Sequence, residues 1–482
     1  MMKKNARLTR RAGRLSALAL AAGAALLLGG CMSLIPNYER PAAPVVPAYA
    51  SALTPPDAPG AKLEAAADTE WQRFFADPRL KRLIELALAN NRDLRVAILN
   101  IEQARATYQV RRADELPTVG AGLIAQRQPG SGGGLVNSYS AGLQVTGYEL
   151  DFFGRVRALS QAALAQYLAT EEARKTAQIT LVAGVATTYI GLLADDELLR
   201  VTSETLKTRE DSFKLTQLRF DNGASSEIDL RQAEQLLETA RAALAQTQRQ
   251  RALDENALTL LVGQPLPADL PAPLPLAAQQ GLADLPAGLP SDLLTRRPDL
   301  LAAEQQLRAA NANIGAARAA LFPRISLTAS AGSASAELSG LFKGGTWALT
   351  GSATLLQTIF DAGRNQANLQ VAGVNKDIAI AQYEKAIQTA FREVSDSLAG
   401  RATLVEQLRA QTAVANAAQA SVKLADLRYR NGVASYFDLL DAQRTLFAAQ
   451  QATVQVQSAQ VQNLVTLYKV LGGGWTEPTK AN

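Results

Sequence analysis

The side chains that most often do chemistry are scarce in this chain of 482 residues. It contains no histidine and a single cysteine, Cys31, so the usual zinc sites and the histidine-based catalytic triads cannot be built. The 44 Asp and Glu residues could still form a carboxylate-only active site, but no glycine-rich phosphate loop or other site motif accompanies them. We therefore expect neither enzyme activity, nor a metal site, nor a bound cofactor.

Cys31 stands at the end of a targeting segment. Six basic residues within the first 14 positions precede an apolar run from Leu15 to Leu28. The run is too short to span a membrane comfortably and predicts a signal peptide over residues 1–30. It closes with Leu28-Gly29-Gly30-Cys31, which resembles a bacterial lipobox. That resemblance implies a covalent lipid (diacylglyceryl and N-acyl) on Cys31, and Met32 in place of an aspartate implies sorting to the outer membrane. An incidental cysteine is the alternative.

The net charge gives no support to nucleic-acid binding. Six of the 49 basic residues and none of the 44 acidic residues lie in the signal segment, so the +5 of the full chain becomes −1 without it. The basic pI of about 9.2 is thus a property of the leader.

The chain is organised around a turn that occurs twice. The stretch from Leu218 to Leu230 is followed, 209 residues later, by a similar stretch from Leu427 to Leu439. In each, a helical pattern runs into Asn-Gly, whose glycine can adopt the positive φ that ends a helix. A serine with an aspartate three residues later can then cap the next helix. Each copy is predicted to be the tip of an antiparallel helical hairpin.

The repeat extends well beyond these turns. The same offset of 209 relates Gly142 to Gly351, and an offset of 206 relates Pro117 to Pro323. An offset this long indicates two duplicated halves rather than a solenoid, whose repeats are a few tens of residues long.

Each half also contains a pair of candidate strands, at 118–150 and 324–357. In the second pair, apolar positions alternate with Ser326, Thr328 and Ser330. Each strand is about ten residues long, which a tilted strand needs to cross a bilayer. A half-exposed soluble sheet would alternate in the same way. We favour the membrane, because two isolated hairpins on a helical lipoprotein would have no core to pack on.

Four strands cannot close a barrel by themselves. In lipid an open sheet edge leaves backbone groups unpaired, which costs several kcal/mol for each group. Strands that span the membrane must therefore be pooled from several chains. Two chains would give eight strands and three would give twelve, and the count alone does not choose between them. A barrel of twelve strands leaves a lumen, whereas one of eight is nearly filled by its own side chains.

Long helices are predicted after each hairpin, over 154–222 and 363–431, because no proline interrupts either segment. At 1.5 Å per residue each would be roughly 100 Å long. Their alanine-rich sequences allow close side-by-side packing, and an ordinary coiled coil is the simpler interpretation. Return helices are expected over 227–262 and 436–471, and a further helix from Asp77 to about Leu116 opens the first half.

These elements predict the following organisation: a signal peptide (1–30), a lipid-anchored extended tether (31–70), a first half (71–263), a proline-rich crossover (264–298), a second half (299–472) and a short tail (473–482). The crossover holds eight of the 20 prolines and is therefore expected to be irregular.

Several short motifs resemble those of the TolC-like outer membrane factors, in the OprM-type branch of efflux lipoproteins. Singly each is weak, but their order and the duplication are specific. They cover nearly all of the mature chain and are Tyr38-Glu39-Arg40-Pro41, Trp71 to Pro78, Arg297-Pro298-Asp299-Leu300, Phe322-Pro323-Arg324-Ile325, Phe360 to Arg364, Leu440-Asp441-Ala442-Gln443 and Leu471 to Trp475.

The resemblance implies a mainly α fold with a membrane β-barrel portion, in which a homotrimer forms a tunnel of twelve strands and twelve helices. It implies an outer membrane channel that exports small molecules such as drugs. The expected partners are a periplasmic adaptor (membrane fusion) protein, an inner-membrane RND-type pump driven by the proton motive force, and outer membrane lipids. Nucleic acid is not expected.

The resemblance also assigns roles to the two tips. The adaptor-docking loops would be Asn222-Gly223-Ala224-Ser225 and Asn431-Gly432-Val433-Ala434. Phe437 and Asp441 fall where the family's apolar and acidic constrictions close the resting pore. Tyr429 and Arg430 match positions that hold the closed tip. The family commonly has leucine at the position of Phe437, and no role follows for Asp438.

The constriction also has a physical basis. Phe437 and Asp441 are four residues apart and share one face of a helix. Three copies around an axis would stack an apolar ring on an acidic ring that favours cations. A solvated charge or a helix cap is the alternative for Asp441.

Other functions stay open within and beyond this class. The cargo could be metal ions or a secreted polypeptide instead of drugs, because substrate choice resides largely in the pump. A structural lipoprotein that spans the periplasm would use the same helices without membrane strands. A lipid-anchored enzyme would need a concave site with convergent acids.

Overall fold

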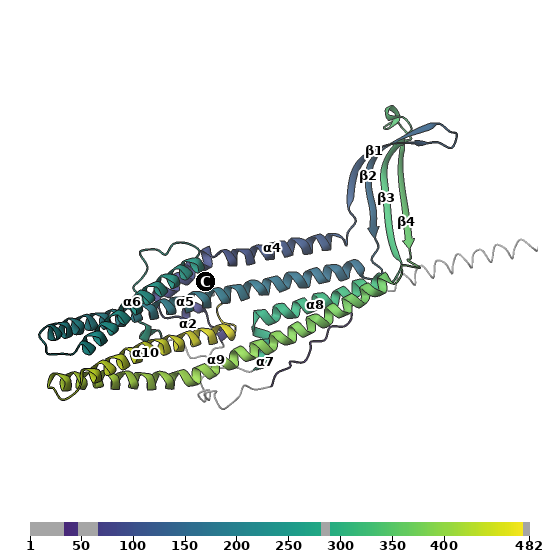
Figure 1. The fold of residues 1–482 in the computed structure, drawn as a ribbon. Helices are drawn as coiled ribbons and strands as arrows, with labels where there is room; N and C mark the ends of the chain where they lie inside the picture. The colour runs from purple at the N-terminus through teal and green to yellow at the C-terminus, as the bar shows by residue number, and fades with distance from the viewer. Residues whose placement is uncertain (1–32, 47–65, 281–289, 476–482) are drawn as a thin grey trace, which may run out of the picture. The chain divides into compact units, whose positions relative to one another are not determined.

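The computed structural model describes residues 33–46, 66–280 and 290–475 (Figure 1). The predicted signal peptide, Cys31, part of the tether and the last seven residues of the tail lie outside this range. The chain forms two compact units. Among the described residues, the strand unit comprises 33–41, Glu102–Ala169 and Ala303–Gln382. The helical unit comprises 42–46, 66–101, 170–280, 290–302 and 383–475.

The two longest helices correspond to each other in the repeat. Helix α5 (Arg155–Asp221) and helix α9 (Arg364–Arg430) have 67 residues each and contribute to both units. Their return helices are α6 (Glu227–Val262) and α10 (Tyr436–Val470). Helix α5 contains an 18-residue stretch apolar enough to cross a membrane, but 67% of that stretch is buried inside the protein. Helix α5 is therefore a core helix.

The prediction of one continuous helix from Asp77 to about Leu116 is wrong, because the structure has two helices there. The structure has α3 (Pro78–Asn90) and α4 (Arg92–Ala113), separated at Asn91. The Asn91 side chain accepts a hydrogen bond from the Leu94 backbone at 2.9 Å and donates one to the Leu261 carbonyl at 2.9 Å. This capping by an internal asparagine ends one helix and begins the next.

The crossover contains more regular structure than its prolines suggest. A 3₁₀ turn, η2 (Leu276–Gln280), and helix α7 (Pro290–Arg296) lie within it, and α8 (Pro298–Ala319) follows Arg297 directly. Arg297 stands where the first half has Asn91. Its Nη1 donates to the Val470 carbonyl at 3.0 Å, the counterpart of the Leu261 carbonyl. Both halves thus break a helix pair at the same place and tie the break to the end of the return helix.

Asp77 organises the beginning of the helical unit. It is fully buried and caps α3 by accepting a hydrogen bond from the Arg79 backbone at 2.8 Å. Its other oxygen accepts from the Tyr189 hydroxyl at 2.8 Å and from the Gln279 amide at 2.6 Å. Burial, followed by this bond to Asp77, raises the pKa of Tyr189. One carboxylate therefore joins α3, α5 and η2.

The strand unit contains one antiparallel sheet in the order β1-β2-β3-β4. Its strands are β1 (Val119–Pro129), β2 (Leu135–Glu149), β3 (Arg324–Ser335) and β4 (Trp347–Leu356), with a short 3₁₀ turn, η3 (Leu338–Gly340), between the last two. The two predicted hairpins are joined by the pairing of β2 with β3. Gly142 lies opposite Gly332 there, and a Cβ on either would collide with the facing backbone.

The register places apolar side chains on one face of this sheet. Leu143 pairs with Ala121 and Ala331, and Ala331 pairs with Leu349. Because partners in register share a face, this face also carries Val119, Leu123, Val145, Trp347 and Leu355. The opposite face carries Gln126, Ser140, Gln144, Thr328, Ser330, Thr350, Ser352 and Thr354. Over most of its length the sheet thus has one mainly apolar and one mainly polar face. The exceptions include Ser333 on the apolar face and Ile124 on the polar face.

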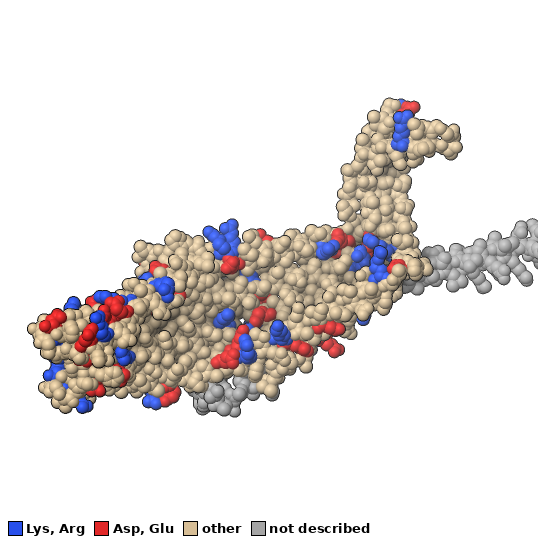
Figure 2. Space-filling view, in the orientation of Figure 1, with Lys and Arg blue, Asp and Glu red and all other residues tan. Residues whose placement is uncertain are grey.

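Charged side chains are confined to the ends of the strands. The four strands contain three of them, Arg127, Glu149 and Arg324, each within three residues of a strand end. Figure 2 shows the resulting uncharged middle of the sheet. An uncharged band with an apolar face is the pattern of a strand that crosses a lipid bilayer.

Candidate channel wall, tips and gate

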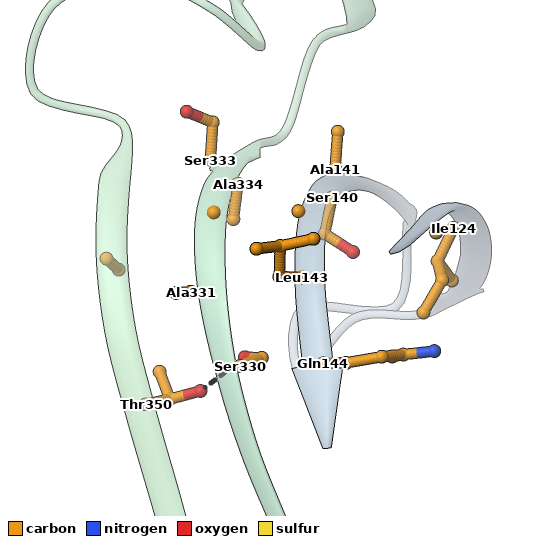
Figure 3. A pocket seen from close by; sticks show the side chains of 14 residues that line it. Ile124, Ser140, Ala141, Leu143, Gln144, Ser330, Ala331, Ser333, Ala334 and Thr350 are labelled. Carbon is orange, nitrogen blue, oxygen red and sulfur yellow. Dashed lines mark hydrogen bonds between the residues drawn. The ribbon is translucent and has the colours of Figure 1, made fainter. Parts of the chain in front are cut away.

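The polar face of the sheet offers a wall rather than an active site. A shallow hollow of about 140 Å³ lies on the sheet (Figure 3). It is lined by hydroxyl and amide side chains such as Ser140, Gln144 and Ser330, by alanines and glycines, and by the larger apolar residues Ile124 and Leu143. The Ser330 and Thr350 hydroxyls are 2.7 Å apart and hydrogen-bonded. None of the lining residues is titratable, so their side chains offer no general acid or base. Such a surface suits contact with water and uncharged solutes.

Both helical tips have the same loop geometry. Gly223 and Gly432 take positive φ values of 71° and 73°, as the Asn-Gly pattern predicts. The Ala224 amide donates to the Arg219 carbonyl at 2.7 Å, and the Val433 amide donates to the Arg428 carbonyl at 2.9 Å. These bonds are those of a Schellman motif, which satisfies the last carbonyls of the helix. The candidate docking loops 222–225 and 431–434 are therefore matching, well-defined turns.

Each tip is closed on the other side by a capping box. Ser226 and Asp229 begin α6, and Ser435 and Asp438 begin α10. The Asp438 carboxylate accepts hydrogen bonds from the Ser435 amide at 3.0 Å and the Ser435 hydroxyl at 2.9 Å. This is the reciprocal arrangement that satisfies the first amides of a helix. The predicted cap is thus confirmed in the second turn. It gives Asp438, for which the family resemblance assigned no role, a structural role.

Tyr429 connects the two tips. The guanidinium of Arg219, near the end of α5, donates to the Tyr429 hydroxyl at 2.6 Å and lies 5.1 Å from the centre of its ring. The ring of Tyr429 is 5.2 Å from that of Tyr436, and it packs on a buried cluster that includes Leu236 and Leu440. One side chain thus joins α5, α9 and α10.

Arg430 contacts its own helix instead. Its guanidinium forms an ion pair of 2.9 Å with Asp426, four residues earlier, and the Arg430 side chain is 71% exposed. An exposed pair of this kind stabilises a helix by only about 0.3–0.5 kcal/mol. Within the described part of the chain, Arg430 forms no ion pair with the other tip.

Phe437 and Asp441 lie on the open face of α10. Phe437 is 54% exposed, and Asp441 is also exposed. Among the residues that the structure describes, no hydrogen bond or ion pair engages the Asp441 carboxylate. Their neighbours Tyr436 and Leu440 are buried. A large apolar side chain and a free carboxylate thus project together from the first turns of α10.

Arg219 is the tip residue that sequence reasoning missed. Both halves have arginine at this position, since Arg428 corresponds to Arg219, so the repeat gives no reason to single it out. The signal that could have identified Arg219 lies in the residue that it contacts, Tyr429. The first half has Phe220 where the second has Tyr429, and only the second has a hydroxyl that needs a partner.

The residues that follow Cys31 are not a free tether. Between residues 33 and 46 the chain forms no helix or strand, as predicted, but its first part packs on α8. Tyr38 and Arg40 both bond to Glu304, at 3.1 and 2.7 Å. Burial alone would raise the pKa of Glu304, but hydrogen bonds from Arg40 and Arg308 lower it. The Pro36 carbonyl accepts a hydrogen bond from Asn311 at 2.8 Å.

Comparisons with known proteins agree with this geometry. Residues 83–264 and 289–473 match the family model described as outer membrane efflux protein. The chain is 50% identical over 464 residues to the antibiotic efflux pump outer membrane protein ArpC of Pseudomonas putida, covering 94% of this chain and 95% of that protein. It is 46% identical over 461 residues to the outer membrane protein OprJ of Pseudomonas aeruginosa, with coverage of 94% and 95%.

Solved structures give the same result. The open state of the Neisseria gonorrhoeae MtrE outer membrane channel aligns with a TM-score of 0.83 and 40% identity, covering 92% of this chain and 99% of that one. The Campylobacter jejuni CmeC outer membrane channel aligns with a TM-score of 0.84 and 25% identity, covering 92% and 95%. The fold is thus TolC-like, and proteins of this class are channels, not enzymes. The chain belongs to the outer membrane efflux protein family and is an outer membrane efflux channel.

Proposed function

We propose that three copies of this chain form the exit duct of a tripartite efflux system. The duct is lipid-anchored in the outer membrane, docks a periplasmic adaptor through its tips and receives small molecules from an inner-membrane RND-type pump. The observation that carries this proposal is the sheet, which has two distinct faces and two open edges.

The open edges require further strands. Within the described residues β1 and β4 each pair with a single neighbour, so one backbone edge of each stays unpaired. In lipid those groups cost several kcal/mol each unless another strand pairs with them. Three sheets joined edge to edge give a closed barrel of twelve strands. The apolar face with Leu143 and Leu349 then meets lipid, and the polar face with Ser330 and Thr350 surrounds a water-filled lumen.

The docking of residues 33–41 supports a lipid anchor on Cys31. Leu34 lies beside Arg318, whose guanidinium reaches the Leu34 carbonyl at 3.4 Å, and Arg318 precedes the membrane strand β3 by six residues. Cys31 is three residues before Leu34, a span of at most about 11 Å. An acyl chain on Cys31 can therefore reach the lipid that surrounds the strands. Relatives named for toluene, solvent or antibiotic efflux support small apolar molecules as the cargo.

The exposed pair on α10 supports a gate. Around a threefold axis, three Phe437 side chains would form an apolar ring and three Asp441 carboxylates an acidic ring one turn away. The ring at Asp441 favours cations and opposes passive leakage of anions. Tyr429 holds the gate closed by bonding α9 to α5. The loops 222–225 and 431–434, with Val433 67% exposed at one of them, present a rigid surface to the adaptor.

The proposal is tested by conductance in planar lipid bilayers. Purified wild-type protein should give small, cation-selective currents, and Asp441→Ala should give larger currents with less preference for cations. Glu234→Ala, which removes a half-buried acid of α6 that pairs with Arg231, is the control and should behave as wild type. If Asp441→Ala leaves both conductance and selectivity unchanged, Asp441 has no part in the gate. If the purified wild-type protein forms no channel at all, the pooled barrel itself is wrong.

A further inference from the structure

Two aspartates of the first half lie against each other inside the helical unit. Asp195 on α5 is 7% exposed, and its Oδ2 atom has no hydrogen-bond donor in the described parts of the chain. The carboxyl group of Asp254 on α6 is within hydrogen-bonding reach of the Asp195 carboxyl group. Two ionised carboxylates have only acceptor atoms, so this contact is repulsive unless one of them carries a proton.

In the second half, the positions that correspond to these two aspartates hold no acids. Asn463 corresponds to Asp254, Leu404 to Asp195 and Gly400 to Gly191. The Asn463 amide lies on Gly400, where a Cβ would overlap it, and its Nδ2 donates to the Ser397 carbonyl at 2.9 Å. An amide brings its own donor to this close contact between a long helix and its return helix.

The first half keeps the close contact but has no built-in donor. A Cβ on Gly191 would lie 3.1 Å from Asp254 Oδ2, so the carboxyl group of the return helix again lies on a glycine of the long helix. The Gln250 amide donates to Asp254 Oδ1 at 3.0 Å, which leaves the contact with Asp195 unsatisfied. A donor must come from elsewhere.

Neighbouring charges do not supply that donor. Arg251 of α6 is engaged by Asp196 at 2.6 Å and by Glu255 at 2.8 Å. From α10, the neutral Gln462 side chain donates to the Thr187 carbonyl at 3.4 Å. Burial, then the charge and hydrogen bond of Asp254, then the charge of Asp196 raise the pKa of Asp195 to about 7, and Arg251 only partly opposes them. The described residues contain no group of three acids that could hold a metal ion.

We propose that Asp195 and Asp254 form a proton-binding site, in which one proton is shared between a carboxylic acid and a carboxylate and joins α5 to α6. Like charges at this distance cannot both ionise, as in other carboxylate pairs. The pair replaces, in the first half, the amide contact of Asn463 in the second. Unlike that amide contact, it depends on pH. This inference is independent of the trimer, the anchor and the gate proposed above.

The site predicts the sign of a pH effect on stability. An aspartate has an ordinary pKa of about 3.9 when unfolded, and the folded value here is raised to about 7. Between these values the folded protein holds a proton that the unfolded chain has released. The stabilisation from this pair is therefore complete at acid pH, falls as the pH rises from about 4 and is lost above about 7.

Infrared spectroscopy of the full-length protein in detergent tests the proposal directly. Wild type at pH 6 should show the carbonyl stretch of one protonated carboxylic acid per chain, which disappears with a midpoint near pH 7. Asp254→Asn should lack this band, because the new amide donates to an ionised Asp195. Asp396→Asn, which removes an exposed aspartate of the second half, should keep the band.

Thermal unfolding between pH 5.5 and 8 gives a second, independent readout. The wild-type midpoint should fall across this range, whereas Asp254→Asn should lose that slope. The double variant Asp195→Leu and Asp254→Asn, which copies the second half, should lose it as well. Absence of the band from wild type at pH 6, or its persistence in Asp254→Asn, would overturn the shared proton. A wild-type midpoint at pH 8 that rises with added Ca²⁺ or Mg²⁺, but not in Asp254→Asn, would overturn it in favour of a cation site.

Discussion

Tyr429→Phe is the sharpest test of the proposal that the Tyr429 contact holds the channel closed. The substitution removes one oxygen atom and keeps the ring, so the contacts with Tyr436 and with the Arg219 guanidinium, 5.2 and 5.1 Å between their centres, stay in place. What is lost is the 2.6 Å hydrogen bond from Arg219. Phenylalanine is compatible with this end of a long helix, because Phe220 occupies the same position at the end of α5.

The structure sets the size of the expected effect. A hydrogen bond to a charged group contributes about 1.5–3 kcal/mol, and Arg219 can recover part of this from water because the tip is accessible. The net loss of stabilisation of the closed tip is then about 1 kcal/mol per subunit, which raises the ratio of open to closed tips by a factor of about five. If three subunits open together, the factor is roughly one hundred.

Single-channel recordings in planar bilayers measure this ratio. Tyr429→Phe should raise the open probability and leave the conductance of the open state unchanged. Asp426→Ala is the control, since it breaks the neighbouring ion pair with Arg430 within one helix and should have no effect on opening. Equal open probabilities for wild type and Tyr429→Phe would refute the role of the Arg219 contact.

Three further predictions concern stability and processing. Asp77→Ala removes the cap of α3 and leaves the Tyr189 hydroxyl and the Gln279 amide without their acceptor. It should lower the free energy of unfolding by roughly 3 kcal/mol, measured by denaturant titration. A change below about 1 kcal/mol would contradict this role of Asp77. Arg297→Ala leaves Asp299 and Glu393 without the cation that bonds them at 2.6 and 2.9 Å. Because these two carboxylates are 37% and 36% exposed and water can solvate them, the free energy of unfolding should fall by about 1–3 kcal/mol. A second substitution, Glu393→Gln, should restore part of this loss in the same titration. Cys31→Ser should yield a protein that lacks the mass of the acyl chains and keeps its leader, as measured by intact-mass spectrometry. A variant whose mass differs from that of wild type only by the exchange of sulfur for oxygen would exclude Cys31 as the lipid site.

The fold was predictable where local chemistry and the repeat agree. Asn-Gly followed by Ser and Asp fixes both tips, because a positive φ and a capping box leave few alternatives. The two long helices begin and end within one residue of the expected positions, since only Gly154, Gly363 and the Asn-Gly turns interrupt the helical pattern. The pairing of β2 with β3 was not predictable. It joins residues nearly 200 positions apart, and alternation specifies a face but not a neighbour.

The remaining differences have local physical reasons. The break at Asn91 was missed because the apolar period continues through it, and only its side-chain contacts show that the helix ends. Asp438 is the aspartate of the predicted capping motif, so the sequence indicated its contact with Ser435. Arg219 and the Asp195 and Asp254 pair depend on contacts between distant helices, and no spacing within one segment reveals them.

In the proposed trimer the polar face of the sheet surrounds a water-filled lumen. Thiol modification of two adjacent residues during bilayer recordings tests it most directly, with wild type treated by the same reagent as the control. Ser330→Cys lies on the polar face and Ala331→Cys on the apolar face of the same strand. A charged thiol reagent should reduce the current through Ser330→Cys and leave Ala331→Cys unchanged. The proposed channel wall would be contradicted if the reagent reduced the current through Ala331→Cys, or if it left the current through Ser330→Cys unchanged.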